Sequence, residues 1–449
     1  MTWLESRRRA TRRASARRVC SGRIPAPLLL LIVAVGGASD GAGAEPATRS
    51  GCREIAAGSD LAAVLESAPA DGSLCLAPGV YDGPIRIGER TTLRGPRDAV
   101  IRSTGEGTTV RLEANGAALV GITVDGSGGR FDLLDAAVHV QAADARVEGV
   151  QVRNAVFGIL VERSKRALVK GNEVIGDPSQ PLGLRGDSIR LWETQHSRVE
   201  DNLVRDGRDV VVWYSSDNRI EGNRVERSRY GTHLMYSHRN RIEANHFVGN
   251  VTGLFLMYSR DIDVVDNVIA GSAGSAGIGL GLKESGNLRV VANDFVRNTV
   301  GIYVDLSPLW PDDHNVFERN VIRLGDAGIV FLGATARNEF RENVLRDNLV
   351  SVRVDGGDDA LAASWRGNDF DDYVGYDLDG DGTGDVPYEL RSLSSELVSR
   401  SPALAFLRGT PALGFAEAIG RVVPLFEPKL LLVDPEPRTG PPPEARLAR

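Results

Sequence analysis

Residues 209–259 decide the fold, and they read DVVVWYSSDNRIEGNRVERSRYGTHLMYSHRNRIEANHFVGNVTGLFLMYS. Three segments of this stretch align without gaps: 210–215, 232–237 and 254–259. Trp213, Met235 and Met257 fall in one column of the alignment, which makes the repeat 22 residues long. That length is too short for the helix pairs of ankyrin or tetratricopeptide repeats, and it fits one coil of a β-solenoid.

Alternation along these strands separates inward-facing from outward-facing side chains. The inward pairs stack from coil to coil as Val210/Val212, Thr232/Leu234, Leu254/Leu256, Ile278/Leu280 and Ile302/Val304. An asparagine also recurs once per coil, as Asn172, Asn202, Asn223, Asn245, Asn267, Asn293, Asn320, Asn343 and Asn368. Because its amide can hydrogen-bond the equivalent atom one coil above, we interpret this column as a structural ladder.

The repeat predicts an all-β protein, a right-handed parallel β-helix over residues 91–370. Residues 45–90 are expected to cap its N-terminal end with a short helix that begins near Ser59 or Asp60. Two further segments follow the β-helix, an acidic loop and then a helical or disordered tail with short C-terminal helices: residues 371–391 and 392–449.

The first 44 residues have the features of a secretory signal peptide. Residues 7–18 are basic, residues 28–35 are apolar, and small residues offer a cleavage site near Ala44. The apolar run is shorter than the roughly 20 residues that cross a bilayer, so we expect an exported protein. The mature chain keeps two cysteines, Cys52 and Cys75, and in an oxidising compartment this pair suggests a disulfide.

Charge narrows the class of partners. Without residues 1–44 the chain carries 45 basic and 58 acidic residues, a net charge of −13. Nucleic-acid-binding proteins need a basic surface, so nucleic acid is not an expected partner. An acidic balance is compatible with cationic ligands.

The outward strip of the repeat carries the first candidate site. Met235 and Met257 lie one coil apart, His233 lies two positions from Met235, and Trp213 is their neighbour. Adjacent strands lie about 4.8 Å apart, so flexible thioethers and an imidazole could converge on one ion. Thioether sulfur with imidazole favours Cu(I), and the indole face could add cation–π attraction. An apolar patch covered by a partner explains the same strip equally well.

The acidic loop carries the second candidate site. Asp377, Asp379, Asp381, Thr383 and Asp385 match the first nine positions of an EF-hand loop, with Gly at its sixth position. We expect a structural Ca²⁺ site in preference to a bare acidic turn. The twelfth position lacks the usual glutamate, so the bidentate ligand would have to come from Asp371 or Asp372.

A third set consists of charged residues and one tyrosine: Asp187 with Arg190, Arg208 with Asp209, Arg229 with Tyr230, Lys283 and Asp305. An outward lysine with acids could abstract a proton from a uronic acid, as in a polysaccharide lyase or epimerase. Surface ion pairing of little energetic value is the simpler interpretation. Among the other histidines, His139, His196 and His314 are expected to be solvated turn residues.

The blocks GDSIRLW, GRDVVVWYS, RYGTHLMYS, VTGLFLMYS, GIGLGLKES and NDFDDYVGYDLDGDGTGDVPY resemble the NosD family. The resemblance runs from about Cys52 to Leu407, and one departure is Phe370, where family members often carry Trp. The family comprises periplasmic β-helix proteins of nitrous oxide reductase maturation.

The resemblance implies a non-enzymatic, copper-handling role in the periplasm. It implies an ABC transporter partner with permease and ATPase subunits, a copper donor protein, and nitrous oxide reductase as the recipient. It supports His233, Met235 and Met257 as Cu(I) ligands with Trp213 beside them. The alternatives from the residues remain a polysaccharide lyase or epimerase and a scaffold without metal.

Overall fold

The computed structural model describes residues 51–333, 335–355, 359–393, 396–397, 401–407, 410, 415 and 428–440. The predicted leader lies outside these residues, as does much of the predicted tail. Among the described residues, no helix combines the length and the apolar character needed to cross a membrane.

Three long parallel sheets run through the chain, and each coil contributes one strand to each sheet in turn. The first sheet contains, in spatial order, β1 (Cys52–Ile55), β2 (Ser73–Leu76), β5 (Thr92–Arg94), β8 (Ala118–Val120), β11 (Arg146–Glu148), β14 (Leu168–Lys170), β17 (Arg198–Glu200), β20 (Arg219–Glu221), β23 (Arg241–Glu243), β26 (Arg260–Val265), β29 (Gly286–Val291), β32 (Asn315–Glu318), β35 (Asn338–Arg341) and β38 (Ser364–Arg366).

The second sheet contains β3 (Gly79–Asp82), β6 (Ala99–Arg102), β9 (Thr123–Asp125), β12 (Gln151–Arg153), β15 (Glu173–Ile175), β18 (Leu203–Arg205), β21 (Arg224–Glu226), β24 (His246–Val248), β27 (Val268–Ala270), β30 (Asp294–Val296), β33 (Val321–Arg323), β36 (Val344–Arg346) and β39 (Asp369–Phe370).

The third sheet carries the candidate copper strip. It contains β4 (Ile85–Ile87), β7 (Val110–Leu112), β10 (Ala136–Val140), β13 (Phe157–Glu162), β16 (Ile189–Trp192), β19 (Asp209–Trp213), β22 (Tyr230–Met235), β25 (Thr252–Met257), β28 (Ile278–Lys283), β31 (Val300–Asp305), β34 (Ala327–Leu332) and β37 (Val350–Val354).

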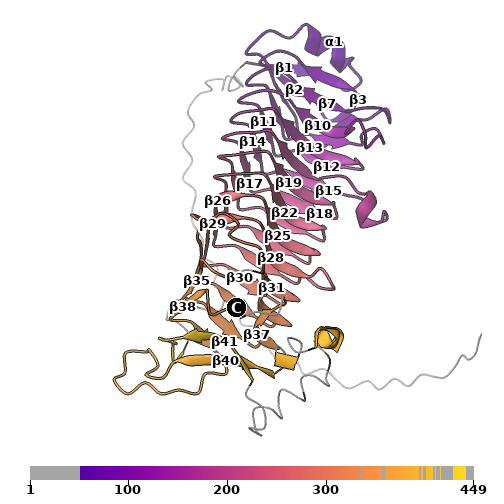
Figure 1. Ribbon diagram of the computed structural model, residues 1–449. Helices are drawn as coiled ribbons and strands as arrows, with labels where there is room; N and C mark the ends of the chain where they lie inside the picture. The colour runs from indigo at the N-terminus through magenta and orange to yellow at the C-terminus, as the bar shows by residue number, and fades with distance from the viewer. Residues whose placement is uncertain are drawn as a thin grey trace, which may run out of the picture. The chain divides into compact units, whose positions relative to one another are not determined.

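The predicted parallel β-helix is confirmed, and Figure 1 shows the strands of successive coils stacked one above the next. Its core consists of the predicted aliphatic columns. Leu234, Leu256 and Leu282 are fully buried and lie in register across β22, β25 and β28. The sheets begin earlier than predicted, because β1 to β4 of the expected cap already pair with the following coils.

The asparagine column is the predicted hydrogen-bonded ladder. The Asn245 amide nitrogen donates to the Ile220 carbonyl and to Asn267 Oδ1, both at 2.9 Å. Asn245 Oδ1 accepts from the Asn223 backbone N–H and from Asn223 Nδ2, also at 2.9 Å. The pattern is the same for neighbouring rungs, and it satisfies polar groups that are buried inside the turns.

The N-terminal end is closed by α1 (Leu61–Glu66), whose first turn is capped by the Asp60 carboxylate. Leu61 and Leu65 of this helix are buried. The sulfur atoms of Cys52 and Cys75, on the adjacent strands β1 and β2, lie 2.04 Å apart and are bonded.

The C-terminal end contains a strand pair that the sequence patterns did not indicate. β40 (Tyr388–Ser392) pairs in antiparallel fashion with β41 (Lys429–Asp434), which lies in the predicted helical or disordered tail. Asp434 ends the asparagine ladder, because its carboxylate accepts from the backbone N–H and the amide of Asn368. The described part of the tail also contains a short 3₁₀ helix, Pro402–Leu407, and another 3₁₀ helix, Leu182–Leu184, lies between β15 and β16.

Candidate metal centre

The candidate copper strip, which contains Trp213, Met235 and Met257, is a column on the outward face of the third sheet. Backbone register pairs Trp192 with Trp213, Trp213 with Met235, and Met235 with Met257. Lys283 follows Met257 in the same column. Parallel pairing without slippage at these residues holds equivalent side chains one strand spacing apart, about 4.8 Å.

His233 and Met257 are in direct contact. His233 Nε2 lies 3.2 Å from Met257 Sδ, and Met235 occupies the coil position beside Met257. Metal–nitrogen bonds of about 2.0 Å and metal–sulfur bonds of about 2.3 Å place two ligand atoms of one ion roughly 3–4 Å apart. The observed separation therefore fits two donors of one soft metal ion.

His233 lies in a desolvated aromatic pocket and is only 6% exposed. Its ring contacts Tyr230, Trp213 and Phe255, with centroid distances of 4.8, 5.5 and 6.3 Å. Burial lowers the pKa of His233 to about 4, against a smaller upward effect of Asp209 and together with the charge of Arg229. The imidazole is therefore neutral near pH 7, which is the form that binds metals.

One buried nitrogen of this histidine lacks a partner. His233 Nδ1 is buried and makes no hydrogen bond within the described part of the chain. Trp213 Nε1 is in the same condition. The Trp213 ring meets the His233 imidazole edge-on at 90°, and the Arg190 guanidinium lies 5.4 Å from the centroid of the Trp213 ring.

A row of alternating charges runs along the same sheet towards His233. Arg190 contacts Asp187 at 3.5 Å, Arg208 contacts Asp187 at 2.6 Å, and Arg208 contacts Asp209 at 3.5 Å. The interpretation of these pairs as exposed surface ion pairs is wrong, because Asp187 is 0% exposed and Asp209 is 1% exposed. Burial raises the pKa of Asp187 and lowers the pKa of Arg190.

The residues proposed for sugar chemistry do not form one group. Lys283 and Asp305 are register partners on β28 and β31, beyond Met257. The Asp187–Arg208 pair lies on the other side of the copper strip, in coils that precede β22. Burial raises the pKa of Asp305, while Lys283 has an opposing effect.

Two features near the strip escaped prediction. Tyr214, Tyr236 and Tyr258 stack along one corner, with centroids 5.4 and 4.8 Å apart and nearly parallel rings. Tyr230 contacts His233 because β22 has one extra residue relative to β19. The spacing in the sequence indicates this extra residue, because Arg208 and Arg229 are 21 residues apart while Trp213 and Met235 are 22 residues apart.

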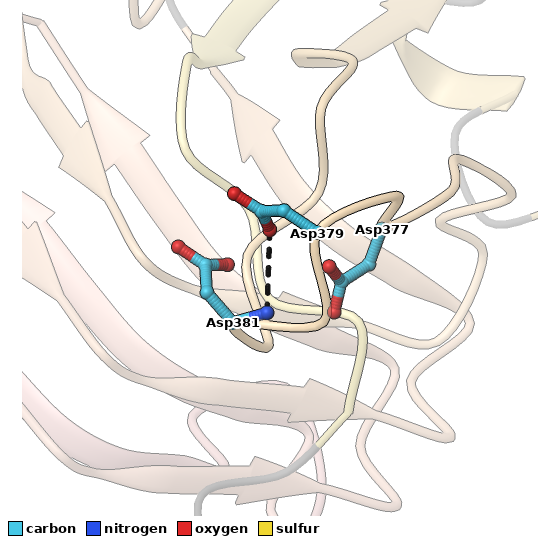
Figure 2. A group of neighbouring side chains, drawn as sticks. All are labelled: Asp377, Asp379 and Asp381. Atoms are coloured by element: carbon cyan, nitrogen blue, oxygen red, sulfur yellow. Dashed lines mark hydrogen bonds between the residues drawn. The ribbon is translucent and has the colours of Figure 1, made fainter.

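The acidic loop brings its first three aspartates together (Figure 2). Ligand atoms of Asp377, Asp379 and Asp381 lie within 4.8 Å of one another. Asp377 accepts from the backbone N–H groups of Gly380 and Gly382, and Asp381 accepts from Thr383 N. Burial alone would raise the pKa of Asp377, but the backbone N–H groups that bond its carboxylate, those of Gly382 and Gly380 foremost, lower this pKa below its usual value.

The rest of the predicted calcium site is less complete. Asp385 accepts from Leu378 N at 2.6 Å, which closes the loop. Asp371 accepts from Asp347 N, and Asp372 accepts from the Tyr388 hydroxyl. Both residues expected to supply the bidentate ligand are thus engaged elsewhere, and calcium binding stays a prediction.

His139 was misassigned as a solvated turn residue. It lies on β10, is 8% exposed, and contacts Glu162 at 3.1 Å and Arg111 at 3.2 Å. The sequence could have indicated this position, because His139 lies between Val138 and Val140 in a strand and therefore faces outward on the third sheet.

Comparison with known proteins gives concordant results. A family profile described as "Periplasmic copper-binding protein (NosD)" matches residues 178–375. A "Probable ABC transporter binding protein NosD" from Stutzerimonas stutzeri is 27% identical over 399 residues, which cover 78% of this chain and 83% of that protein. The protein of the same name from Pseudomonas aeruginosa is 28% identical over 406 residues, covering 80% and 86%.

Solved structures support the fold. The catalytic unit of an α-1,3-glucanase from Streptomyces thermodiastaticus superposes with a TM-score of 0.50 at 15% identity. The superposition covers 73% of this chain and 64% of that one. At this identity the likeness concerns the β-helix architecture alone.

Proposed function

Because the chain belongs to the NosD family, we propose that it is a periplasmic, non-enzymatic copper-handling protein that supplies Cu(I) for maturation of nitrous oxide reductase. It would be exported with cleavage near Ala44 and would act beside the permease and ATPase subunits of an ABC transporter. A copper donor protein would load it. The names of the matching family, a copper-binding family, and of the relatives, ABC transporter binding proteins, support this assignment.

The observation that carries the proposal is the contact of His233 Nε2 with Met257 Sδ at 3.2 Å in a desolvated pocket. Neutral nitrogen and thioether donors suit Cu(I) better than hard divalent ions, which prefer carboxylate oxygens. Met235 is the third donor, one register position away. Trp213 closes one side of the pocket as an edge-on wall.

The test is Cu(I) competition against a chromogenic chelator with the mature chain, residues 45–449. Wild type should take Cu(I) from the chelator, while Met235→Ala/Met257→Ala and His233→Ala should lose this ability. His246→Ala is the matched control, because His246 is exposed on β24 of the second sheet. Equal uptake by wild type and the double variant would place the ligands elsewhere.

A scaffold without metal is the second candidate function. The exposed corner tyrosines favour it, since Tyr214 is 47% and Tyr236 is 42% exposed, and exposed apolar surface marks interaction sites. Absence of Cu(I) uptake by every variant, wild type included, would make this candidate the better one.

A further inference from the structure

The orientation of the His233 imidazole poses a physical problem. Metal-binding histidines almost always donate their other ring N–H to an acceptor, and that bond fixes the ring. Here Nδ1 is buried and makes no hydrogen bond to any residue that the structure describes, so the orientation that points Nε2 at Met257 must have another cause.

Packing of aromatic rings supplies that cause. Trp213 and Phe255 meet the imidazole nearly edge-on, at 90° and 82°. Tyr230 is the nearest ring and the closest to parallel, with a centroid distance of 4.8 Å and an interplanar angle of 32°. Rotation of the imidazole about its Cβ–Cγ bond would drive its edge into the Tyr230 face, so Tyr230 restrains this rotation most directly.

A register shift places Tyr230 beside His233. Side chains three positions apart on a regular strand point to opposite faces. The pairing of β19 with β22 shifts between Asp209 and Val211, and the extra residue lets both Tyr230 and His233 face outward. Gly231 makes this local geometry feasible, because a Cβ there would lie 2.3 Å from the Gly253 carbonyl oxygen.

The buried Asp209 and the partly exposed Arg229 hold Tyr230 in place. Asp209 Oδ1 accepts the Tyr230 backbone N–H at 3.1 Å and the Arg229 Nε–H at 3.1 Å. The Arg229 Nη2 group bonds the other carboxylate oxygen. The Arg229 guanidinium in turn lies 4.9 Å from the centroid of the Tyr230 ring.

We propose that Tyr230 is a positioning residue of the copper site: its ring, held by Asp209 and Arg229, keeps His233 Nε2 directed at Met257. The inference rests on the proposed function, since it takes His233 as a Cu(I) ligand. In this site the face of an aromatic ring orients the imidazole, whereas in other metal sites a hydrogen bond from the second ring nitrogen does so.

The experiment measures Cu(I) affinity by competition with the chromogenic chelator for three variants of the mature chain. Tyr230→Leu keeps apolar bulk but removes the flat ring, and it should weaken Cu(I) binding about 10–100-fold, as losses of supporting residues do. Tyr230→Phe keeps the ring and should restore binding to within about threefold. Tyr236→Leu is the matched control, because Tyr236 stacks on Tyr214 and Tyr258 and lies at the exposed corner.

Rescue by phenylalanine separates ring positioning from a role of the hydroxyl group. Binding by Tyr230→Leu within threefold of wild type would overturn the inference, as would an equal loss in Tyr236→Leu. If Tyr230→Leu has no cooperative thermal transition, Arg229→Gln decides: the inference requires a loss of at least threefold in a folded protein. Failure of wild type to bind Cu(I) would instead count against the proposed function.

Discussion

Replacing Asn245 by alanine removes one rung of the asparagine ladder without touching the copper strip. The side chain donates two hydrogen bonds and accepts two, all at 2.9 Å, and it is 0% exposed. A net value of about 1 kcal/mol per hydrogen bond gives a loss of about 4 kcal/mol in the free energy of unfolding. Water cannot replace these bonds at a position with no accessible surface.

The assay is urea unfolding of the mature chain, followed by the fluorescence of its tryptophans, of which Trp213 lies one coil and Trp192 two coils before Asn245. Asn154→Gly is the control, because Asn154 is exposed and bonds only to Asp125 among the described residues, and because glycine readily adopts the φ of 56° at this position. That variant should change the unfolding free energy by less than about 0.5 kcal/mol. A loss below about 1 kcal/mol in Asn245→Ala would refute the ladder as a source of stability.

Three further predictions concern pH, calcium and the disulfide. Burial lowers the pKa of His233 to about 4. As the pH falls from about 6.5 to about 4, this histidine is therefore protonated in the unfolded chain but stays neutral in the folded chain. Over this range the free energy of unfolding of wild type should fall by up to about 3 kcal/mol more than that of His233→Gln. Millimolar Ca²⁺ should raise the melting temperature by a few degrees in wild type but not in Asp379→Asn, measured by differential scanning fluorimetry, and an identical response in both would remove Asp379 from the site. Cys75→Ser should lower the unfolding free energy by about 3 kcal/mol, because the bond closes a loop with a sequence separation of 23; calorimetry showing no loss would contradict it.

The sequence was sufficient for the parts of the fold that repeat. A column such as Val212, Leu234 and Leu256 recurs at a fixed spacing, and only stacked strands bury such a column continuously. β41 could not be predicted from the sequence, because it pairs with β40 across 36 intervening residues and the two strands are not part of the repeat. Pairings that occur once leave no periodic signal.

In the candidate site, too, the residues that repeat from coil to coil were predicted and the irregular ones were not. His233, Met235, Met257 and Trp213 were predicted from the outward columns, and the structure brings these four together. The contact of Tyr230 with His233 was not predicted, because a one-residue shift between coils changes which face a side chain occupies. Burial of Asp187 and Asp209 also escaped prediction, since a charged residue at an outward strand position is normally solvated.

The unshifted register of β22, β25 and β28 has a consequence for how such a site could arise and change. Each coil adds one outward residue to the column that holds Met235 and Met257, while the aliphatic core behind it stays the same. In-frame duplication of a single 22-residue unit would therefore insert another thioether about 4.8 Å along the column without repacking the interior. The number of soft donors on this face would then follow the number of methionine-bearing units and not the total number of coils.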